Sequence, residues 1–183
     1  MNDLSLHVID IIQNSLKAGA SLLKLIIAEN LNEDSLLITI EDNGLGMSRE
    51  QIEKLEDPFF TSRTTRRVGM GIPLFKQSAE QSEGSFEVVS IEGEGTRVTA
   101  RFRHSHIDRP PLGDIANAFI LMVSANPFVE FLFTYRYNTK EYIFDTVEVK
   151  EILDGLPVND PKIIKILTEM IKSNIEELKI TGL

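Results

Sequence analysis

The sequence predicts an α+β protein, a two-layer α/β sandwich in which helices cover a largely antiparallel sheet. One observation is that segments with apolar residues every three or four positions are interspersed with short segments of alternating apolar and polar residues. A second is that two pairs of these short segments are joined by tight turns, at 92–95 and 138–140, as neighbouring antiparallel strands are. Helices layered on such a sheet can bury their apolar stripes against one of its faces.

The first part of the chain follows the order helix, strand, strand, helix, loop, helix, strand, strand. Asp3 is a suitable N-cap for the first helix, and Gly19 is a suitable residue to end it. The predicted elements are helix Leu4–Ala18, strands Ser21–Glu29 and Ser35–Glu41, a short helix after Ser48, a helix from Ile72 to about Gln81, and strands Ser85–Ile91 and Thr96–Arg103.

A second, small α+β unit is predicted over residues 114–183, after a linker at 105–113 that contains a pair of prolines. We expect residues 1–104 to form the first domain and the second unit to bind a protein partner. The aromatic residues of its hairpin favour core packing and cross-strand pairing over a ligand cage. Its predicted elements are helix Ile115–Ala125, strands Phe128–Tyr137 and Glu141–Asp145, and helices Val147–Leu153 and Pro161–Leu178.

Composition restricts the class of protein. The 183 residues are 42% hydrophobic and 26% charged, as in soluble globular proteins. No apolar run approaches the roughly 20 residues of a membrane span, and the start has no basic segment typical of a secretory signal. We therefore expect a cytoplasmic protein. The net charge of −9 argues against nucleic-acid binding, because that binding depends on neutralising phosphates.

The stretch around Asp42 is the strongest indication of a ligand site. An alternating strand ends there in an acidic residue followed by Gly44 and Gly46. An ionised aspartate is a hydrogen-bond acceptor suited to an exocyclic amine, and glycines let a flat ligand approach the backbone. The same pattern is also common at ordinary strand-to-loop turns, so the other segments of the chain must show whether it marks a ligand site.

Three further segments support a ligand site, although each has a simpler interpretation. Asp10 and Asn14 are four residues apart and share one side of the first helix, which could also be a solvated face. Residues 57–68 could form a loop over a ligand or an ordinary connection. Gly69 and Gly71 precede a helix whose free N–H groups could bind an anion, but the segment matches neither a P-loop nor a dinucleotide fingerprint. His104 and His106 indicate a metal site only weakly.

Four motifs in a fixed order resemble the ATP-binding domain of the GHKL superfamily, the Bergerat fold of gyrase, histidine kinases and mismatch-repair ATPases. The resemblance covers about residues 1–104. The segment from Phe59 to Leu74 looks most like the histidine-kinase branch. The motifs are Asp10–Ala20, Asp42–Met47, Gly69–Ile72 and Gly93–Thr96.

The resemblance implies a site for ATP and Mg²⁺. Asn14 would hold the Mg²⁺, and Asp42 would accept a hydrogen bond from the adenine amine, with Thr96 supporting it through water. Gly44 and Gly46 would let the purine lie flat. The other residues expected to contact the nucleotide are Lys17, Met47, Thr61, Arg63, Gly69, Met70, Gly71 and Ile72.

The resemblance also predicts a catalytic group, with one departure from the family. Asp10 stands where family hydrolases carry a glutamate as general base, and its side chain is one methylene shorter. Because no phosphoacceptor histidine segment precedes the domain, we expect a stand-alone kinase that phosphorylates a separate partner, either like the anti-sigma serine kinases or as part of a split sensor kinase. The alternative is a slow ATPase or nucleotide-dependent switch. The sequence does not define the oligomeric state.

Overall fold

The computed structural model describes residues 3–56 and 71–182, and all statements about the structure refer to these residues. Thr61, Arg63, Gly69 and Met70, together with the loop expected at 57–68, lie outside the described part. The helices are α1 (Leu4–Lys17), α2 (Arg49–Glu56), α3 (Gly71–Gln81), α4 (Ile115–Ala125), α5 (Thr146–Leu153) and α6 (Pro161–Thr181). The strands are β1 (Leu22–Asn30), β2 (Ser35–Asp42), β3 (Ser85–Ile91), β4 (Gly95–Arg103), β5 (Glu130–Tyr137) and β6 (Lys140–Asp145).

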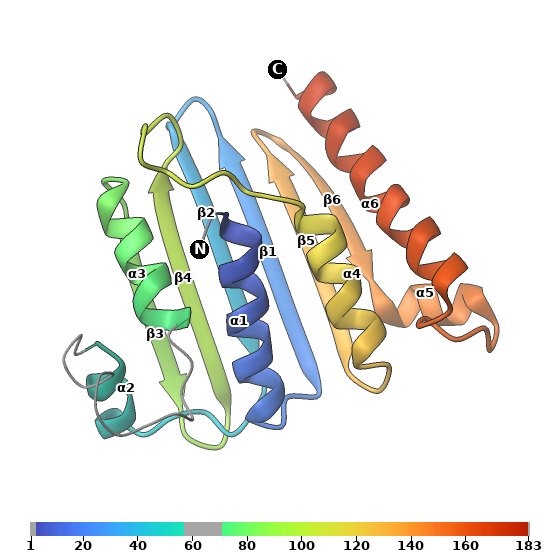
Figure 1. Cartoon of the computed structure of the whole chain (residues 1–183), viewed down its shortest axis with the longest axis horizontal. Coiled ribbons are helices and arrows are strands. Elements are labelled where there is room, and N and C mark those ends of the chain that lie inside the picture. Colours follow the sequence, from blue (N-terminus) through green and yellow to red (C-terminus); the bar gives the residue numbers. More distant parts are fainter. Residues whose placement is uncertain (1–2, 57–70, 183) are drawn as a thin grey trace.

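The strands form one six-stranded sheet in the order β3-β4-β2-β1-β5-β6 (Figure 1). Every neighbouring pair is antiparallel except β1 and β5, which are parallel. The parallel pair joins the predicted C-terminal hairpin to the first part of the chain, with Leu25 opposite Phe133. The expected α+β class, the element order and the layered helices are confirmed. The division at 105–113 remains a prediction, although the sheet runs through both parts.

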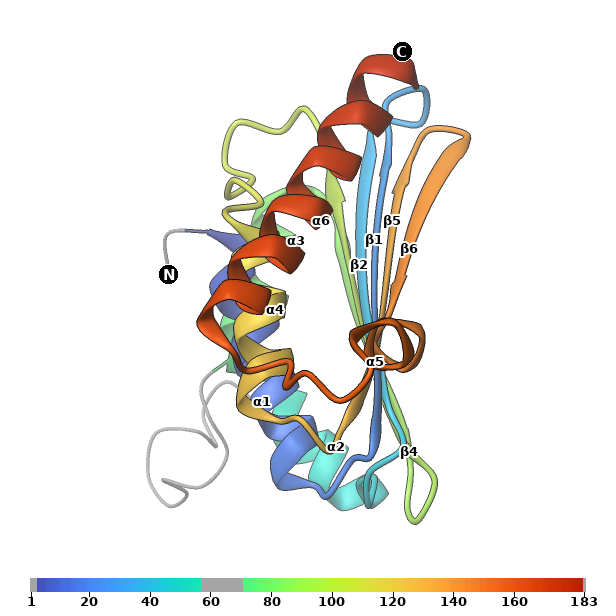
Figure 2. The same ribbon diagram turned by 90° about the vertical axis from the view of Figure 1, so that its right-hand side faces the viewer.

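Helices α1, α3, α4 and α6 lie on one side of the sheet, and no described element covers the other face (Figure 2). Buried and partly exposed residues alternate along β1, which explains this arrangement. Leu23, Leu25 and Ile27 are at most 2% exposed, whereas the residues between them are not buried. Burying such side chains is worth about 1.5–3 kcal/mol each. The sheet and the helices therefore share one apolar layer.

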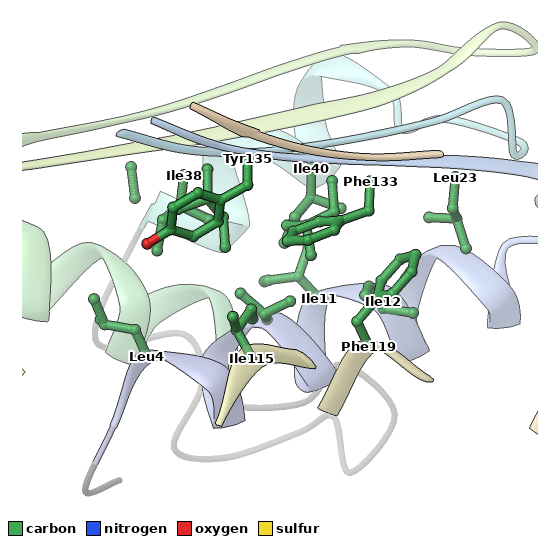
Figure 3. Close-up of a cluster of buried hydrophobic side chains, with 14 of the residues drawn as sticks. Leu4, Ile11, Ile12, Leu23, Ile38, Ile40, Ile115, Phe119, Phe133 and Tyr135 are labelled. Carbon is green, nitrogen blue, oxygen red and sulfur yellow. The ribbon is translucent and has the colours of Figure 1, made fainter. Parts of the chain in front are cut away.

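Figure 3 shows how this layer is filled from both sides. Ile38 and Ile40 of β2 and Phe133 of β5 point toward the helices, where Ile11 of α1 and Phe119 of α4 meet them. The ring of Phe119 lies 5.0 Å from that of Phe133, centroid to centroid. The two parts of the chain therefore share a hydrophobic core.

A buried polar cluster ties the C-terminal helix to the sheet. Glu29 at the end of β1 accepts hydrogen bonds from the Tyr135 hydroxyl, from Nε2 of His104 at 2.7 Å and from Nζ of Lys179 at 3.0 Å. Burial alone would raise the pKa of Glu29, but these three donors outweigh it and hold the pKa below its ordinary value. His104 is thus engaged by a carboxylate of the fold.

Candidate functional site

The site residues gather at one end of the sheet, the lower edge in Figure 1. Here the C-terminal end of α1 meets the end of β2 and the turn between β3 and β4, and α3 begins beside the middle of α1, with Gly71 against Asp10. The backbone confirms this proximity, because Leu45 N–H donates to the Ala18 carbonyl at 2.9 Å and Gly93 N–H donates to the Leu45 carbonyl at 2.7 Å.

Asp42, the last residue of β2, has its carboxylate fixed from two directions. Its Oδ1 accepts a hydrogen bond from the Gly44 N–H at 2.9 Å, and its Oδ2 accepts one from the Ser15 hydroxyl of α1. The side chain is only half-buried, and a carboxylate oxygen can accept more than one hydrogen bond. The arrangement can therefore accept a further hydrogen bond from an amine at a defined position.

At Gly44 and Gly46, the backbone after Asp42 packs so closely on neighbouring residues that a side chain would not fit. Gly46 has φ +66°, and a Cβ at this position would collide with the carbonyl oxygen of Ile91. At Gly44 a Cβ would lie 2.9 Å from the Ala18 carbonyl oxygen. Glycine is thus required for the backbone path that keeps the space beside Asp42 free of side chains.

Ser90 joins two of the candidate segments, Asp42–Met47 and Gly93–Thr96. Its hydroxyl donates to the Gly95 carbonyl at 3.0 Å and accepts from the Met47 N–H at 2.8 Å. Thr96 Oγ1 is 2.8 Å from Ser90 Oγ, and because the Ser90 proton goes to Gly95, Thr96 is the donor in this pair. The lone pairs of Thr96 stay available on a residue that is opposite Asp42 in the β2–β4 ladder.

Asp10 and Asn14 are both half-buried on α1, so the simple interpretation of a fully solvated face does not hold. Asp10 packs against the first residue of α3, where a Cβ on Gly71 would lie 2.7 Å from the Asp10 Cβ and 3.1 Å from its Oδ2. The Asn14 Nδ2 is buried and has no hydrogen-bond partner among the described residues. Ile72 is 6% exposed and belongs to the core, while Lys17 is exposed in the last turn of α1.

Two serines of the site were missed by the sequence reasoning. Ser15 occupies a core-facing position of α1, where it is 4% exposed, and a hydroxyl at such a position requires a partner. This was a usable signal, because Ile11 and Ile12 precede Ser15 by one turn on the buried face. No sequence pattern indicated Ser90, because its hydrogen-bond partners come together only in the folded protein.

The weakly indicated histidine metal site is not formed by the described residues. His104 is bound to Glu29, whereas His106 Nδ1 accepts from the Asp108 N–H at 3.2 Å. Within residues 3–56 and 71–182, no group of three or more His, Cys, Asp or Glu side chains is arranged to hold a metal ion. None of the described helices is long and apolar enough to cross a membrane.

Comparison with known proteins identifies the family of this chain. Residues 2–106 match the family described as histidine kinase-, DNA gyrase B-, and HSP90-like ATPase. The chain belongs to this family, as the four motifs suggested. The match ends at the beginning of the predicted linker.

Curated relatives of the chain include a sporulation kinase and a sensor histidine kinase. Sporulation kinase E of Bacillus subtilis is 32% identical over 98 residues, which are 52% of this chain and 13% of that protein. Sensor histidine kinase ZraS of Salmonella typhimurium is 33% identical over 72 residues, 39% of this chain and 15% of that protein. The chain therefore corresponds to a small part of these proteins.

Two solved structures share the fold. The N-terminal domain of a DNA repair protein superimposes with a TM-score of 0.55 at 16% identity, covering 78% of this chain and 52% of that chain. The Aquifex aeolicus MutL ATPase domain complexed with ADP superimposes with a TM-score of 0.50 at 17% identity, covering 84% and 70%.

Proposed function

We propose that this protein binds ATP with Mg²⁺ at the site around Asp42 and transfers the γ-phosphoryl group to a separate protein in the cytoplasm. The observation that carries the proposal is the Asp42 carboxylate, fixed by Ser15 and Gly44 beside a path of glycines. An amine donor on a flat ring, such as adenine, matches that combination of acceptor and free space.

The opposite side of the site suits phosphate. The first turn of α3 begins at Gly71, and the free N–H groups at the start of a helix attract anions. Asn14, whose half-buried side chain lies one helical turn after Asp10, would hold Mg²⁺ through its amide oxygen. Mg²⁺ usually takes one or two protein ligands plus phosphate oxygens and water. When bound, Mg²⁺ would neutralise charge on the phosphates.

Asp10 is the proposed general base. Its carboxylate would accept the proton of an attacking hydroxyl group, whose oxygen then forms a bond to the γ-phosphorus. The bond between that phosphorus and the oxygen bridging to the β-phosphate breaks, and ADP leaves with the electron pair. Gly71 lies directly against Asp10, so the base and the start of α3 would act on the same end of the nucleotide.

A slow ATPase or nucleotide-dependent switch is the second candidate. It is favoured by the same Asp10, because a shorter side chain than the family glutamate reaches a water molecule less easily. In that case nucleotide occupancy would change what residues 114–183 bind. These residues expose aliphatic side chains suited to a protein partner, including Ile152 at 82% and Ile166 at 61% exposure.

The test compares the wild type with Asp10→Asn, which preserves shape but cannot accept a proton at neutral pH. We expect Asp10→Asn to lower ATP turnover, and the phosphorylation of a partner protein bound to the chain, by about 100-fold or more. The affinity for ATP should change little. Glu80→Gln, an exposed position on α3, is the matched control and should behave as wild type. Unchanged turnover in Asp10→Asn would remove Asp10 from its proposed role.

A further inference from the structure

One buried titratable side chain next to the site has no role in the proposed chemistry. His7 lies one helical turn before Asp10 on α1 and is only 2% exposed. Its ring stacks on Phe75 of α3, with 5.1 Å between ring centroids and an interplanar angle of 16°. Its Nε2 is 3.3 Å from the hydroxyl of Ser78, also on α3. The ring is therefore fixed between the two helices.

The other ring nitrogen is unusual. Nδ1 of His7 is buried without a hydrogen-bond partner in the described part of the chain. A buried polar atom left unpaired costs about 1–3 kcal/mol, and a phenylalanine would stack on Phe75 without that cost. Packing by itself thus gives no reason for a histidine at this position.

The contact between α1 and α3 explains what the ring can control. His7 and Asp10 form one stripe of α1, and Gly71, Phe75 and Ser78 form one stripe of α3, three or four residues apart. The stripes run antiparallel, with Gly71 against Asp10 and with Phe75 and Ser78 against His7. The separation of the helices at His7 therefore also sets the separation at Asp10.

The protonation state agrees with this role. Burial lowers the pKa of His7, while the nearby carboxylates of Asp10 and Asp3 act in the opposite direction. A neutral imidazole has one donor and one acceptor nitrogen, so Nε2 can pair with the Ser78 hydroxyl while Nδ1 stays without a partner. Protonation would place a charge in this apolar contact, and removing that charge from water costs free energy. Burial therefore favours the neutral ring.

We propose that His7 is a positioning residue, which holds the first turn of α3 at the distance from α1 at which Asp10 acts on the γ-phosphoryl group. The inference rests on the proposed function and deepens it. Phe75 provides the rigid support, because its ring also packs on Phe86 and Phe102 of the sheet, at 5.9 and 5.8 Å between centroids. His7 thus connects the base to the sheet through α3.

Three substitutions distinguish the effect of the shape of the His7 ring from the effects of its two nitrogens. His7→Phe keeps the stack on Phe75 and removes both nitrogens, His7→Asn places an amide near the position of Nδ1, and His7→Gln places one near Nε2. We expect His7→Phe to lower kcat by about 10- to 100-fold, the effect of a small misplacement of reacting groups, with KM for ATP changed less than about twofold. Partial recovery by Asn or Gln identifies the nitrogen that matters. Gln77→Ala, exposed on α3, should match the wild type.

A wild-type kcat in His7→Phe would overturn the inference, as would a loss of kcat that follows the thermal stability of the variants. If the wild type neither binds nor turns over ATP, the proposed function fails and the catalytic part of this inference fails with it. Amide hydrogen exchange then tests separately whether His7 holds the first turn of α3. The amides of Phe75 and Lys76 close the first turn of α3. We expect them to exchange about tenfold faster in His7→Phe, whereas unchanged exchange would show that His7 does not hold this turn.

Discussion

Replacing Asp42 by asparagine separates recognition of the ligand from maintenance of the fold. The Gly44 N–H can only donate, so in Asp42→Asn the amide oxygen of the new side chain must occupy the position of Oδ1. The new NH₂ group then takes the position of Oδ2, where the Ser15 hydroxyl can rotate to accept from it. Both anchoring hydrogen bonds survive, so we expect the unfolding midpoint to change little.

Affinity for ATP should nevertheless fall. A hydrogen bond to a charged group is worth about 1.5–3 kcal/mol, and about 1.4 kcal/mol corresponds to a factor of ten in affinity. Asp42→Asn should therefore weaken ATP binding by about 10- to 150-fold.

The assay is displacement of a fluorescent ATP analogue from the wild type, from Asp42→Asn and from a control variant. Arg136→Gln is a suitable control, because it alters an exposed ion pair with Glu141 on β5 and β6, away from the site. The reasoning would be refuted if Asp42→Asn bound ATP as tightly as the wild type while remaining folded.

Two further predictions concern the part of the sheet shared with the C-terminal elements. Glu29→Gln should destabilise the fold at pH 7 by about 1–3 kcal/mol, because Tyr135, His104 and Lys179 lose a charged acceptor. The depressed pKa of Glu29 stabilises the wild type above the unfolded value of about 4.3, and that stability is lost as the pH falls through the folded pKa. Denaturant titrations at pH 7 and near pH 3.5 should therefore show a smaller difference between variant and wild type in acid; an equal difference at both pH values would contradict this. Phe119→Ala should cost about 3–5 kcal/mol and lower the unfolding midpoint of β1 and β5 together, because Phe119 packs on Phe133 in the shared core. Hydrogen exchange that resolves the two strands would disprove a common core if only β5 were affected.

Local patterns predicted most of the secondary structure because the determinants are local. The strands β3 and β4 alternate and are joined by a tight turn with Gly93 at φ +83°, and the bounds of β3 and α4 agree with the prediction at every residue. The helix after Asp3 begins as expected, with the Asp3 carboxylate accepting from the Leu6 N–H. These features follow from the chemistry of adjacent residues.

Features that depend on distant residues could not be predicted. The parallel pairing of β1 with β5 brings together residues more than 100 positions apart, and no periodicity encodes such a partner. The hydroxyl of Ser15 reaches Asp42 only after α1 has packed on the sheet. The motifs indicated Asp42, but Ser15, which fixes its carboxylate, became apparent only from the three-dimensional arrangement.

The most direct test of the central claim is calorimetric titration of the wild-type protein with ATP, with and without Mg²⁺. The site around Asp42 and Asn14 predicts saturable binding of one ATP per chain, tighter when Mg²⁺ is present, because the metal would link Asn14 to the phosphates. Absence of measurable ATP binding in either buffer by the folded protein would contradict the claim that this site holds a nucleotide.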